Sequence, residues 1–225
     1  MKRVKAIGII VILISVAVTV TLLLSYTMLE PHQCEWGIAT GDDFLFDIRV
    51  EGAHINEEIP IPFLIFNNTR IQTTIISLPN ISTIDLEQNF EQLVGAMEVH
   101  SVFANGTEFP ADKPEGYDAP WVTTISTMIS RAILPIDEWS LIDRLFFDEN
   151  DYNISVLIGR PENDYYASSN QDYFFFFAHR IFSIDSGNGW YAKLDYGTGF
   201  PFYINHWESD PICIGYYKVI LTLVV

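Results

Sequence analysis

The amino-acid sequence predicts an α+β, β-rich protein in which a single N-terminal transmembrane helix precedes a mainly antiparallel curved sheet or sandwich, partly covered by two short helices. Three observations support this class. Residues 6–24 contain no charged side chain, and a run of this length is sufficient to cross a bilayer as a helix. Several later segments alternate apolar and polar residues with the period of a strand. Short glycine-containing turns separate the last of these segments, and the strand–helix–strand rhythm of a parallel nucleotide-binding sheet is missing.

The apolar segment 6–24 follows three basic residues, Lys2, Arg3 and Lys5. Basic residues remain on the cytoplasmic side of a membrane. We therefore expect a single-pass protein of the cell membrane, with a cytoplasmic N-terminus and an extracellular C-terminal domain. The expected domains are residues 1–29, which form the basic tip and the signal anchor, and residues 30–225, which form one extracellular β-rich domain. The lipid bilayer is the first expected partner, through residues 6–24.

Two other interpretations of this segment remain open. A cleaved signal peptide has a shorter apolar core and a small-residue cleavage site, whereas only Ser25 and Thr27 offer a weak pair of small residues here. A prepilin-like cleavage between Lys5 and Ala6 would leave the apolar helix available for filament assembly, but the acidic or amide residue that such helices carry early is missing. A retained signal anchor fits the segment best.

The part of the chain after residue 5 is strongly acidic. Nine basic residues face 29 acidic ones there, a formal net charge of −20. Such a surface repels phosphate backbones and anionic head groups, which excludes nucleic acid as a partner. Solubility in a cation-rich exterior is the simplest explanation of this charge.

Four N-x-[ST] triplets lie in the part expected outside the cell, and none has proline in the middle. They predict N-glycosylation at Asn67, Asn80, Asn105 and Asn153.

The chain has two cysteines, Cys34 and Cys213. Both lie in the part expected to face an oxidising compartment, so we expect a disulfide bond between them. Two unpaired thiols are the alternative, with Cys213 packed as a small hydrophobic residue.

The first elements expected after the anchor are two strands and a helix. Residues 44–51 alternate apolar and polar side chains after Gly41-Asp42-Asp43, and residues 70–78, rich in Ile and Thr, end at Pro79. Ser82 or Thr83 then caps a helix. Its apolar stripe consists of Leu86, Phe90, Leu93, Val94 and Met97.

The middle of the chain predicts a hairpin and a second helix. Residues 99–103 and 107–109 would pair across a two-residue turn at Asn105-Gly106. Residues 121–132 fit a strand or a helix, and both remain open. Asp137 predicts the N-cap of a helix over residues 138–147, with Ile136 packed on Leu141 as a hydrophobic staple.

Strands dominate the last third of the chain, with turns expected at Gly187-Asn188-Gly189 and Gly197-Thr198-Gly199. The expected strands are residues 154–158, 173–184, 189–196, 200–204 and 215–225. In the aromatic run 173–177, Tyr173, Phe175 and Phe177 would point to one face. Phe174 and Phe176 would point to the other, so both faces of this strand should be covered.

Four segments resemble those of a known group of proteins. The first is Trp36-Gly37 followed by Gly41-Asp42 and Phe44; the others are Ser77-Leu78-Pro79, Pro135-Ile136-Asp137-Glu138-Trp139 and Leu194-Asp195-Tyr196-Gly197-Thr198-Gly199. Together they resemble uncharacterised archaeal membrane-anchored extracellular proteins with a W-G-x-x-x-G-D-x-F opening and a late Y-D-x-x-T-G-like hairpin. The resemblance implies a surface location and a β-rich fold, and it brings no catalytic residue.

No catalytic or metal-binding signature is present in the sequence. The five histidines lie far apart without the H-E-x-x-H spacing, and there is no G-x-S-x-G segment. Acidic pairs such as Asp42-Asp43 and Glu57-Glu58 are interpreted as solvated loops. We therefore expect no catalytic residue, no metal ligand and no cofactor.

These observations favour a membrane-anchored extracellular binding or surface-interaction module. Its expected partner is a surface protein or an apolar ligand, which a curved aromatic sheet would hold in a cavity. The alternatives are a structural component of the cell envelope or of a filament, and a secreted-side hydrolase with an unrecognised site.

Overall fold

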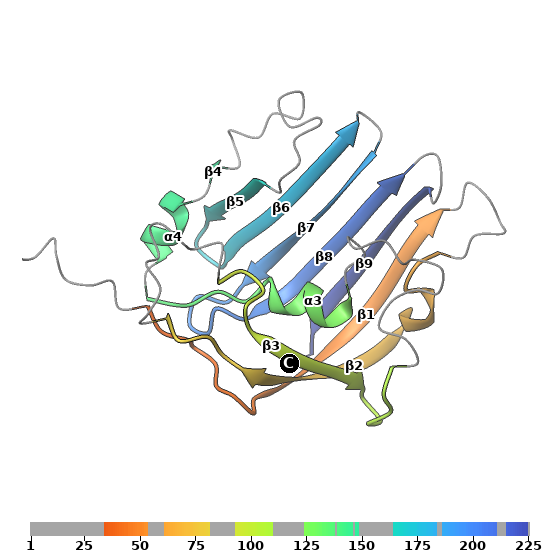
Figure 1. Ribbon diagram of the computed structural model, residues 1–225, viewed down its shortest axis with the longest axis horizontal. Helices are drawn as coiled ribbons and strands as arrows, with labels where there is room; N and C mark the ends of the chain where they lie inside the picture. Colours follow the sequence, from red (N-terminus) through yellow and green to blue (C-terminus); the bar gives the residue numbers. More distant parts are fainter. Residues whose placement is uncertain are drawn as a thin grey trace, which may run out of the picture. The chain divides into compact units, whose positions relative to one another are not determined.

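The computed structural model describes most of the chain after residue 33 (Figure 1). The described ranges are residues 34–53, 61–81, 93–109, 124–137, 139–145, 147–148, 164–183, 186–210 and 215–224. None of the helices in these ranges is long and apolar enough to span a membrane. The expected anchor, residues 6–24, lies outside them and stays a prediction.

The described strands form one sheet in the order β3-β2-β1-β9-β8-β7-β6-β5-β4. Their bounds are β1 Asp43–Ala53, β2 Thr69–Ser77, β3 Glu98–Phe103, β4 Phe147–Asp148, β5 Asp164–Ser169, β6 Phe174–Ser183, β7 Ser186–Leu194, β8 Pro201–Asp210 and β9 Gly215–Leu223. All neighbouring pairs are antiparallel except the short pair of β4 and β5. The predicted β-rich, mainly antiparallel class is confirmed. Within the described ranges the strands form one open sheet, and not a sandwich.

The alternation of apolar and polar residues decides which face of each strand is buried. On β9, Tyr217, Val219 and Leu221 are buried, whereas the intervening residues are exposed or half-buried. The same holds on β1, where Phe46 and Ile48 are buried and the residues between them are not. A strand places successive side chains on opposite faces, so this pattern directs one face of the sheet to the core.

The aromatic run on β6 divides between the two faces as expected. Phe174 and Phe176 are fully buried in the main core. Phe175 and Phe177 point to the opposite face, where they pack with other aromatic side chains in a separate cluster. Both faces of β6 are therefore covered.

The described helices are short. They are the α-helices α3, Ile125–Ser130, and α4, Trp139–Leu145, and the 3₁₀ helix η1, Leu64–Phe66. Helix α3 resolves the ambiguity of residues 121–132. The Thr124 side chain accepts a hydrogen bond of 3.0 Å from the backbone N–H of Thr127. This bond caps the helix, because it satisfies a first-turn N–H group that has no acceptor within the helix. A helix of this length is not stable alone in water, so its burial must stabilise it.

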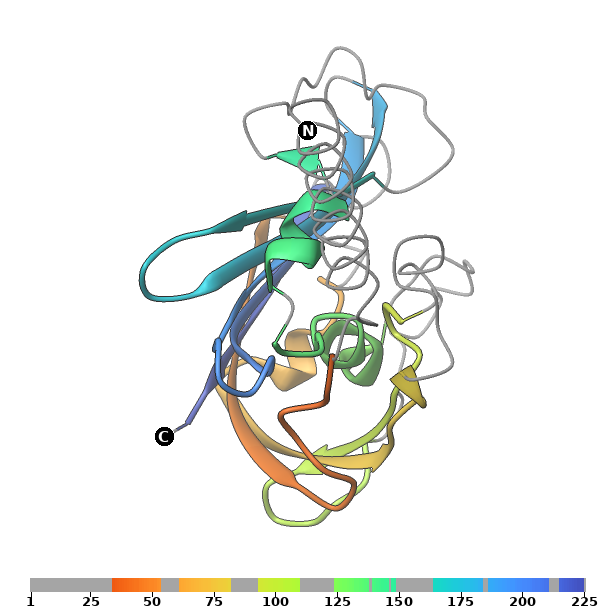
Figure 2. The same cartoon turned by 90° about the vertical axis from the view of Figure 1, so that its left-hand side faces the viewer.

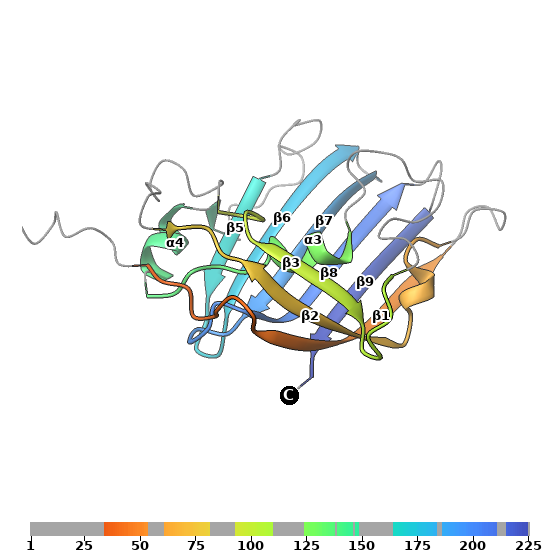
Figure 3. The same cartoon turned by 60° about the horizontal axis from the view of Figure 1, so that its bottom comes forward.

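Burial of α3 accounts for the curvature of the sheet. Ile125, Met128 and Ile129 are fully buried, and α3 contacts both β3 and β8. Three strands separate β3 from β8 in the sheet order, so both can touch one helix only if the sheet curves. Viewed from the side, the sheet bends through β1 and β2 and brings β3 round to the far side of α3 (Figure 2). The turned view shows β3 crossing in front of the other strands (Figure 3).

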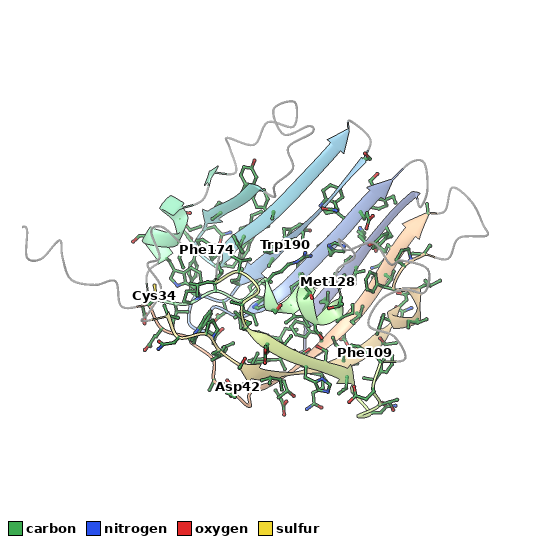
Figure 4. The ribbon with its side chains drawn as sticks, in the orientation of Figure 1. Cys34, Asp42, Phe109, Met128, Phe174 and Trp190 are labelled. Carbon is green, nitrogen blue, oxygen red and sulfur yellow. The ribbon has the colours of Figure 1, made fainter. Side chains whose placement is uncertain are left out.

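We call the face that α3 covers the concave face and the opposite face the convex face. The concave face holds the main core. In Figure 4, Met128 on α3 and Trp190 on β7 lie among the side chains between helix and sheet. Ala132, Ile133 and Leu134, which follow α3, are also fully buried. Side chains therefore fill the described part of the concave face.

Two expectations about helices are corrected. Leu93 and Met97 are buried as the apolar stripe predicts, but residues 93–95 form a turn, so the helix does not continue to Met97. The rest of that expected helix lies outside the described residues. The second helix, expected over 138–147, is confirmed as α4 but ends at Leu145, and Phe147 belongs to β4. Asp137 has a φ of 76°, which is not the extended conformation of an N-cap.

Two expectations about strands are also corrected, and one strand was not expected. Gly187-Asn188-Gly189 lies inside β7, where it pairs with β6 and β8, and is not a turn. Residues 107–109 return beside β3 without forming a strand, although the Phe103 N–H still bonds to the Thr107 carbonyl. The sequence analysis missed β5, because Asp164–Ser169 shows no clear alternation. The expected strand 154–158 lies outside the described residues.

Gly199 provides a test of the packing beneath α3. Its φ is +65°, and a Cβ atom there would lie 1.9 Å from the Leu134 carbonyl oxygen. The Leu134 N–H in turn bonds to the Gly199 carbonyl at 3.0 Å. We expect Gly199→Ala to lower the free energy of unfolding by about 3 kcal/mol or more, from backbone strain and the clash.

Gly106→Ala is the matched control. Gly106 also has a positive φ, +81°, but nothing lies within 4 Å of an added Cβ. Conformational strain alone should then reduce stability by about 1 kcal/mol. Urea unfolding followed by tryptophan fluorescence measures both variants, and equal losses would contradict the packing described for Gly199.

Candidate functional site

The structure separates the expected glycosylation sites by exposure. Asn80 and Asn105 are exposed. Asn67 is half-buried, and its Oδ1 accepts a hydrogen bond of 2.9 Å from the Val50 backbone N–H. Asn153 lies outside the described residues. Asn80 and Asn105 are therefore accessible to modification, whereas the Asn67 carboxamide is held against β1.

Cys34 is half-buried and packs against the main core. Cys213 lies outside the described residues. The disulfide bond expected between Cys34 and Cys213 stays a prediction.

The four segments that carry the family resemblance meet at one end of the sheet. The Trp36 indole N–H bonds to the Pro79 carbonyl at 2.9 Å, which joins the opening segment to the segment after β2. Glu35 and Ile136 form an isolated antiparallel bridge, which joins the opening segment to the segment before α4. Their side chains thus contribute to folding at this end.

The turn between β7 and β8 completes this contact region. The Trp139 indole N–H bonds to the Tyr196 carbonyl at 3.1 Å. Gly37 passes so close to the turn that a Cβ atom there would lie 2.6 Å from the Thr198 Cα. Only glycine permits this approach. The described residues of these four segments thus make structural contacts with one another.

A buried polar cluster lies on the concave face, where β8 meets the end of α3. His206 is 5% exposed, and Arg131 Nη2 lies 3.0 Å from its Nδ1. The Arg131 guanidinium also lies over the Trp190 ring, 4.9 Å from the centroid. Beside them, the Tyr217 hydroxyl donates to Glu208 at 2.8 Å. Sequence reasoning missed this cluster, because Arg131 and His206 are distant in the chain.

The His206 imidazole is neutral and its lone pair is occupied. Burial, and then the positive charge of Arg131, lowers the pKa of His206 well below its usual value of 6.5, and a hydrogen bond to the Gly189 backbone acts in the opposite direction. Arginine can only donate hydrogen bonds, so Nδ1 is the acceptor and the proton is on Nε2. A general base needs a free lone pair close to the substrate, and this histidine does not offer one.

Two acidic residues singled out in the sequence, Asp42 and Asp43, make local hydrogen bonds. The Asp42 carboxylate accepts from the Ala39 N–H at 2.8 Å, and Asp43 accepts from the Thr74 hydroxyl. These acidic residues thus stabilise the start of β1. No group of three or more His, Cys, Asp and Glu side chains that could hold a metal ion is present among the described residues.

The convex face differs from the concave face because it carries aromatic and charged side chains in register. One row crosses six strands from β5 to β1: Tyr166, Phe177, Tyr191, Asn205, Ile220 and Arg49. The next row crosses six strands from β6 to β2: Phe175, Lys193, Tyr203, Thr222, Asp47 and Arg70. Side chains directly opposite on neighbouring strands are close enough to interact.

One half of the convex face is an aromatic belt, on β5 to β8. It consists of Tyr166, Phe175, Phe177, Tyr191, Tyr203 and Trp207. The Tyr191 and Tyr203 rings stack with centroids 5.7 Å apart, and their hydroxyl oxygens lie 3.5 Å apart. Burial, and then the hydrogen bond with Tyr191, raises the pKa of Tyr203 to about 12. Tyr203 is therefore a neutral phenol at any physiological pH.

The other half of the convex face, on β9, β1 and β2, carries ion pairs. Glu51 lies between Lys218 at 2.6 Å and Arg49 at 2.8 Å, and Arg70 pairs with Asp47 at 2.8 Å. The hydrogen bond from Lys218 lowers the pKa of Glu51. Exposed pairs of this kind contribute little to stability, because solvent screens them. Their main effect is to place charged side chains of both signs side by side on this face.

A groove of about 570 Å³ lies between the two halves of the convex face. Residues along it include Asp47, Arg49, Thr69, Tyr203, Ile220 and Thr222. Its volume is within the range of small-molecule sites. The sequence analysis did not find this groove, because β1, β8 and β9 become neighbours only in the folded sheet. The sequence did contain a signal for the groove, namely the residues of these three strands that alternate with the core residues and point to the convex face.

Comparison of the chain with family models, with characterised proteins and with solved structures yields no match. The roles assigned to residues therefore depend on the geometry described above.

The exposure of the sequons predicts their order of modification. In the native host, glycopeptide mass spectrometry should find a glycan on Asn80 and Asn105, and little or none on Asn67. In Asn105, the side-chain Oδ1 already accepts from the Thr107 N–H at 2.9 Å, so the triplet is presented in an exposed turn. High occupancy of Asn67 together with bare Asn105 would contradict this assignment.

The buried His206 predicts a pH dependence of stability. Its pKa is lowered in the folded state, so below about pH 6.5 the unfolded chain binds a proton that the folded chain does not. The free energy of unfolding should thus fall as the pH drops from 6.5, with a contribution of up to about 1.4 kcal/mol per pH unit from this group.

His206→Gln keeps an acceptor for Arg131 but cannot titrate. Compared with the wild type, this variant should lose less stability between pH 7 and pH 5, although it is less stable at pH 7. Urea unfolding of the full-length protein in detergent at several pH values measures both slopes. Other titrating groups are common to the two proteins, so parallel slopes would show that His206 does not titrate as described.

Proposed function

We propose that this chain is a membrane-anchored extracellular binding module that holds its partner on the convex face of its sheet. The observation that carries this proposal is the difference between the two faces. Packed side chains fill the described part of the concave face. The convex face presents charged side chains, a groove and an aromatic belt in which Tyr166 and Phe177 are buried and the other four rings are half-buried.

The composition of the convex face supports a binding role. Tyrosine, tryptophan and arginine are enriched at recognition surfaces, because they combine a large contact area with a polar group. Four of the nine basic residues after residue 5 lie on this face, namely Arg49, Arg70, Lys193 and Lys218. In a chain this acidic, such a concentration of basic residues marks the convex face as distinct from the rest of the surface.

The sequence supports the location. Residues 6–24 and the preceding basic residues favour a signal anchor with the remainder of the chain outside the cell. The sequons and the two cysteines are consistent with an extracellular location. An enclosed cavity for an apolar ligand receives less support, since α3 occupies the concave face.

The two alternative functions have weaker support. A secreted-side hydrolase requires a base and a nucleophile in a cleft, and the buried His206 has its lone pair occupied by Arg131. A structural role in the envelope or in a filament requires self-association. Photo-crosslinking separates self-association from recognition of a different partner.

Site-specific photo-crosslinking tests the proposal. p-Benzoylphenylalanine replaces Thr222, which is exposed on the convex face, in the full-length protein in its native membrane. The matched control replaces Thr40, an exposed threonine in the turn before β1. Irradiation of intact cells should give an adduct at position 222 in several-fold excess over position 40.

Each other outcome counts against the proposal. Adducts of equal yield at both positions, or no adduct at position 222, would contradict recognition through the convex face. Adducts at both positions with twice the mass of the chain would support the envelope role instead.

A further inference from the structure

The groove on the convex face has one aromatic wall and one charged wall. Tyr203 on β8, Thr222 on β9 and Asp47 on β1 lie directly opposite one another in register. Neighbouring strands are about 4.8 Å apart, so the backbones of β8 and β1, which carry the two walls, are roughly 10 Å apart. That separation admits a six-membered ring and its substituents. The groove is too narrow for a helix, whose diameter is about 10–12 Å.

The aromatic wall presents one face of the Tyr203 ring. On the β7 side, Tyr191 stacks on this ring and Lys193 Nζ lies 5.6 Å from its centroid. The groove lies on the other side, toward β9. Tyr203 is half-buried and neutral, and its contacts on β7 hold the ring in place. A fixed, neutral aromatic face favours apolar C–H groups of a ring-shaped ligand.

The charged wall offers hydrogen-bonding groups without net charge. The Asp47 carboxylate is held by Arg70, and Arg49 by Glu51. Thr222 adds a hydroxyl group along the groove, whereas the hydroxyl group of Thr69, which also lines it, donates to the Phe66 carbonyl. The charged side chains that line the groove, Asp47 and Arg49, are of opposite sign, so the groove favours neither an anionic nor a cationic ligand. An alkyl chain would desolvate these polar groups without replacing their hydrogen bonds.

A buried acceptor beside the groove also lacks a donor. Asn205 is 8% exposed, and its Oδ1 has no hydrogen-bond partner among the described residues. Asn205 lies directly opposite Ile220, which lines the groove. Its Nδ2 lies 3.3 Å from the Tyr191 hydroxyl. Buried polar groups without partners are rare in native proteins and often mark a site for water or ligand. A hydroxyl-rich ligand with its bound water supplies the missing donor.

We infer that this groove binds a neutral saccharide unit of an extracellular glycan. The sugar ring stacks on Tyr203, and its hydroxyl groups bond to Asp47, Arg49 and Thr222. This inference rests on the proposed function, because it assigns a ligand class to the same convex face. Tyr203 provides most of the affinity, and the charged wall determines which hydroxyl configuration is accepted.

Saturation-transfer NMR tests the inference. The full-length protein is produced without glycosylation, so that its own glycans cannot occupy the groove, and is placed in nanodiscs. The probes are neutral trisaccharides of glucose, galactose, mannose or N-acetylglucosamine. At least one should receive saturation, with a dissociation constant between micromolar and millimolar. Failure of all four would overturn the inference.

Three variants locate the binding. Tyr203→Ala should weaken binding at least tenfold, whereas Tyr203→Phe, which keeps the ring, should stay within about threefold of the wild type. Thr222→Arg places a bulky cation in the groove from an exposed position and should also abolish binding. Tyr216→Ala is the matched control, because Tyr216 is an exposed tyrosine on β9 outside the groove.

The outcomes distinguish this inference from the proposed function. Equal effects of Tyr203→Ala and Tyr216→Ala would overturn saccharide binding in the groove. If Tyr203→Ala fails to fold, Thr222→Arg still tests the inference, because binding should be lost in that variant as well. If no trisaccharide binds while crosslinking from position 222 still captures a partner, the ligand class is wrong and the proposed function stands. If both experiments fail, the proposed function fails as well.

Discussion

Burial of α3 against the sheet is the constraint on which the described structure depends. The helix has six residues, too few to be stable alone in water, and its apolar side chains are hidden because an edge strand, β3, and a central strand, β8, both reach it. The sheet therefore curves until β3 and β8 contact the same helix. The concave face is filled as a result, and the convex face becomes the broad surface that is available to a partner. The curvature and the candidate site thus have the same physical origin.

The two faces then acquire different chemistry through register. Each strand alternates its side chains, so the residues that fill the core and those that line the groove come from the same strands. On β8, Ile204 and His206 are buried while Tyr203 and Trp207, on the opposite face, are half-buried. A slip of one residue would exchange the two faces. The core that fixes the register therefore also fixes the position of Tyr203 opposite Thr222 and Asp47.

The end of the sheet where the segments around Trp36, Pro79, Trp139 and Gly199 meet stabilises this arrangement. Trp36 and Trp139 each donate an indole hydrogen bond to a backbone carbonyl, and Gly199 packs against the Leu134 carbonyl at a distance that excludes any side chain. These contacts join the segment before β1 to the segment after β2, and the segments after α3 to the turn between β7 and β8. Segments that look like separate signatures in the sequence are thus parts of one contact region, with a structural and not a chemical role.

The sequence by itself determined the strands with clear alternation, the second helix and the division of the aromatic run between two faces, because each depends on local periodicity. Only the tertiary structure decided that the strands form one open sheet, that residues 125–130 are helical and that Gly187-Asn188-Gly189 lies within a strand. Those outcomes depend on long-range pairing and burial, which override local preference. The His206–Arg131 contact and the groove were equally beyond prediction. Their residues are far apart in the chain, and only the order of the strands in the sheet brings them together.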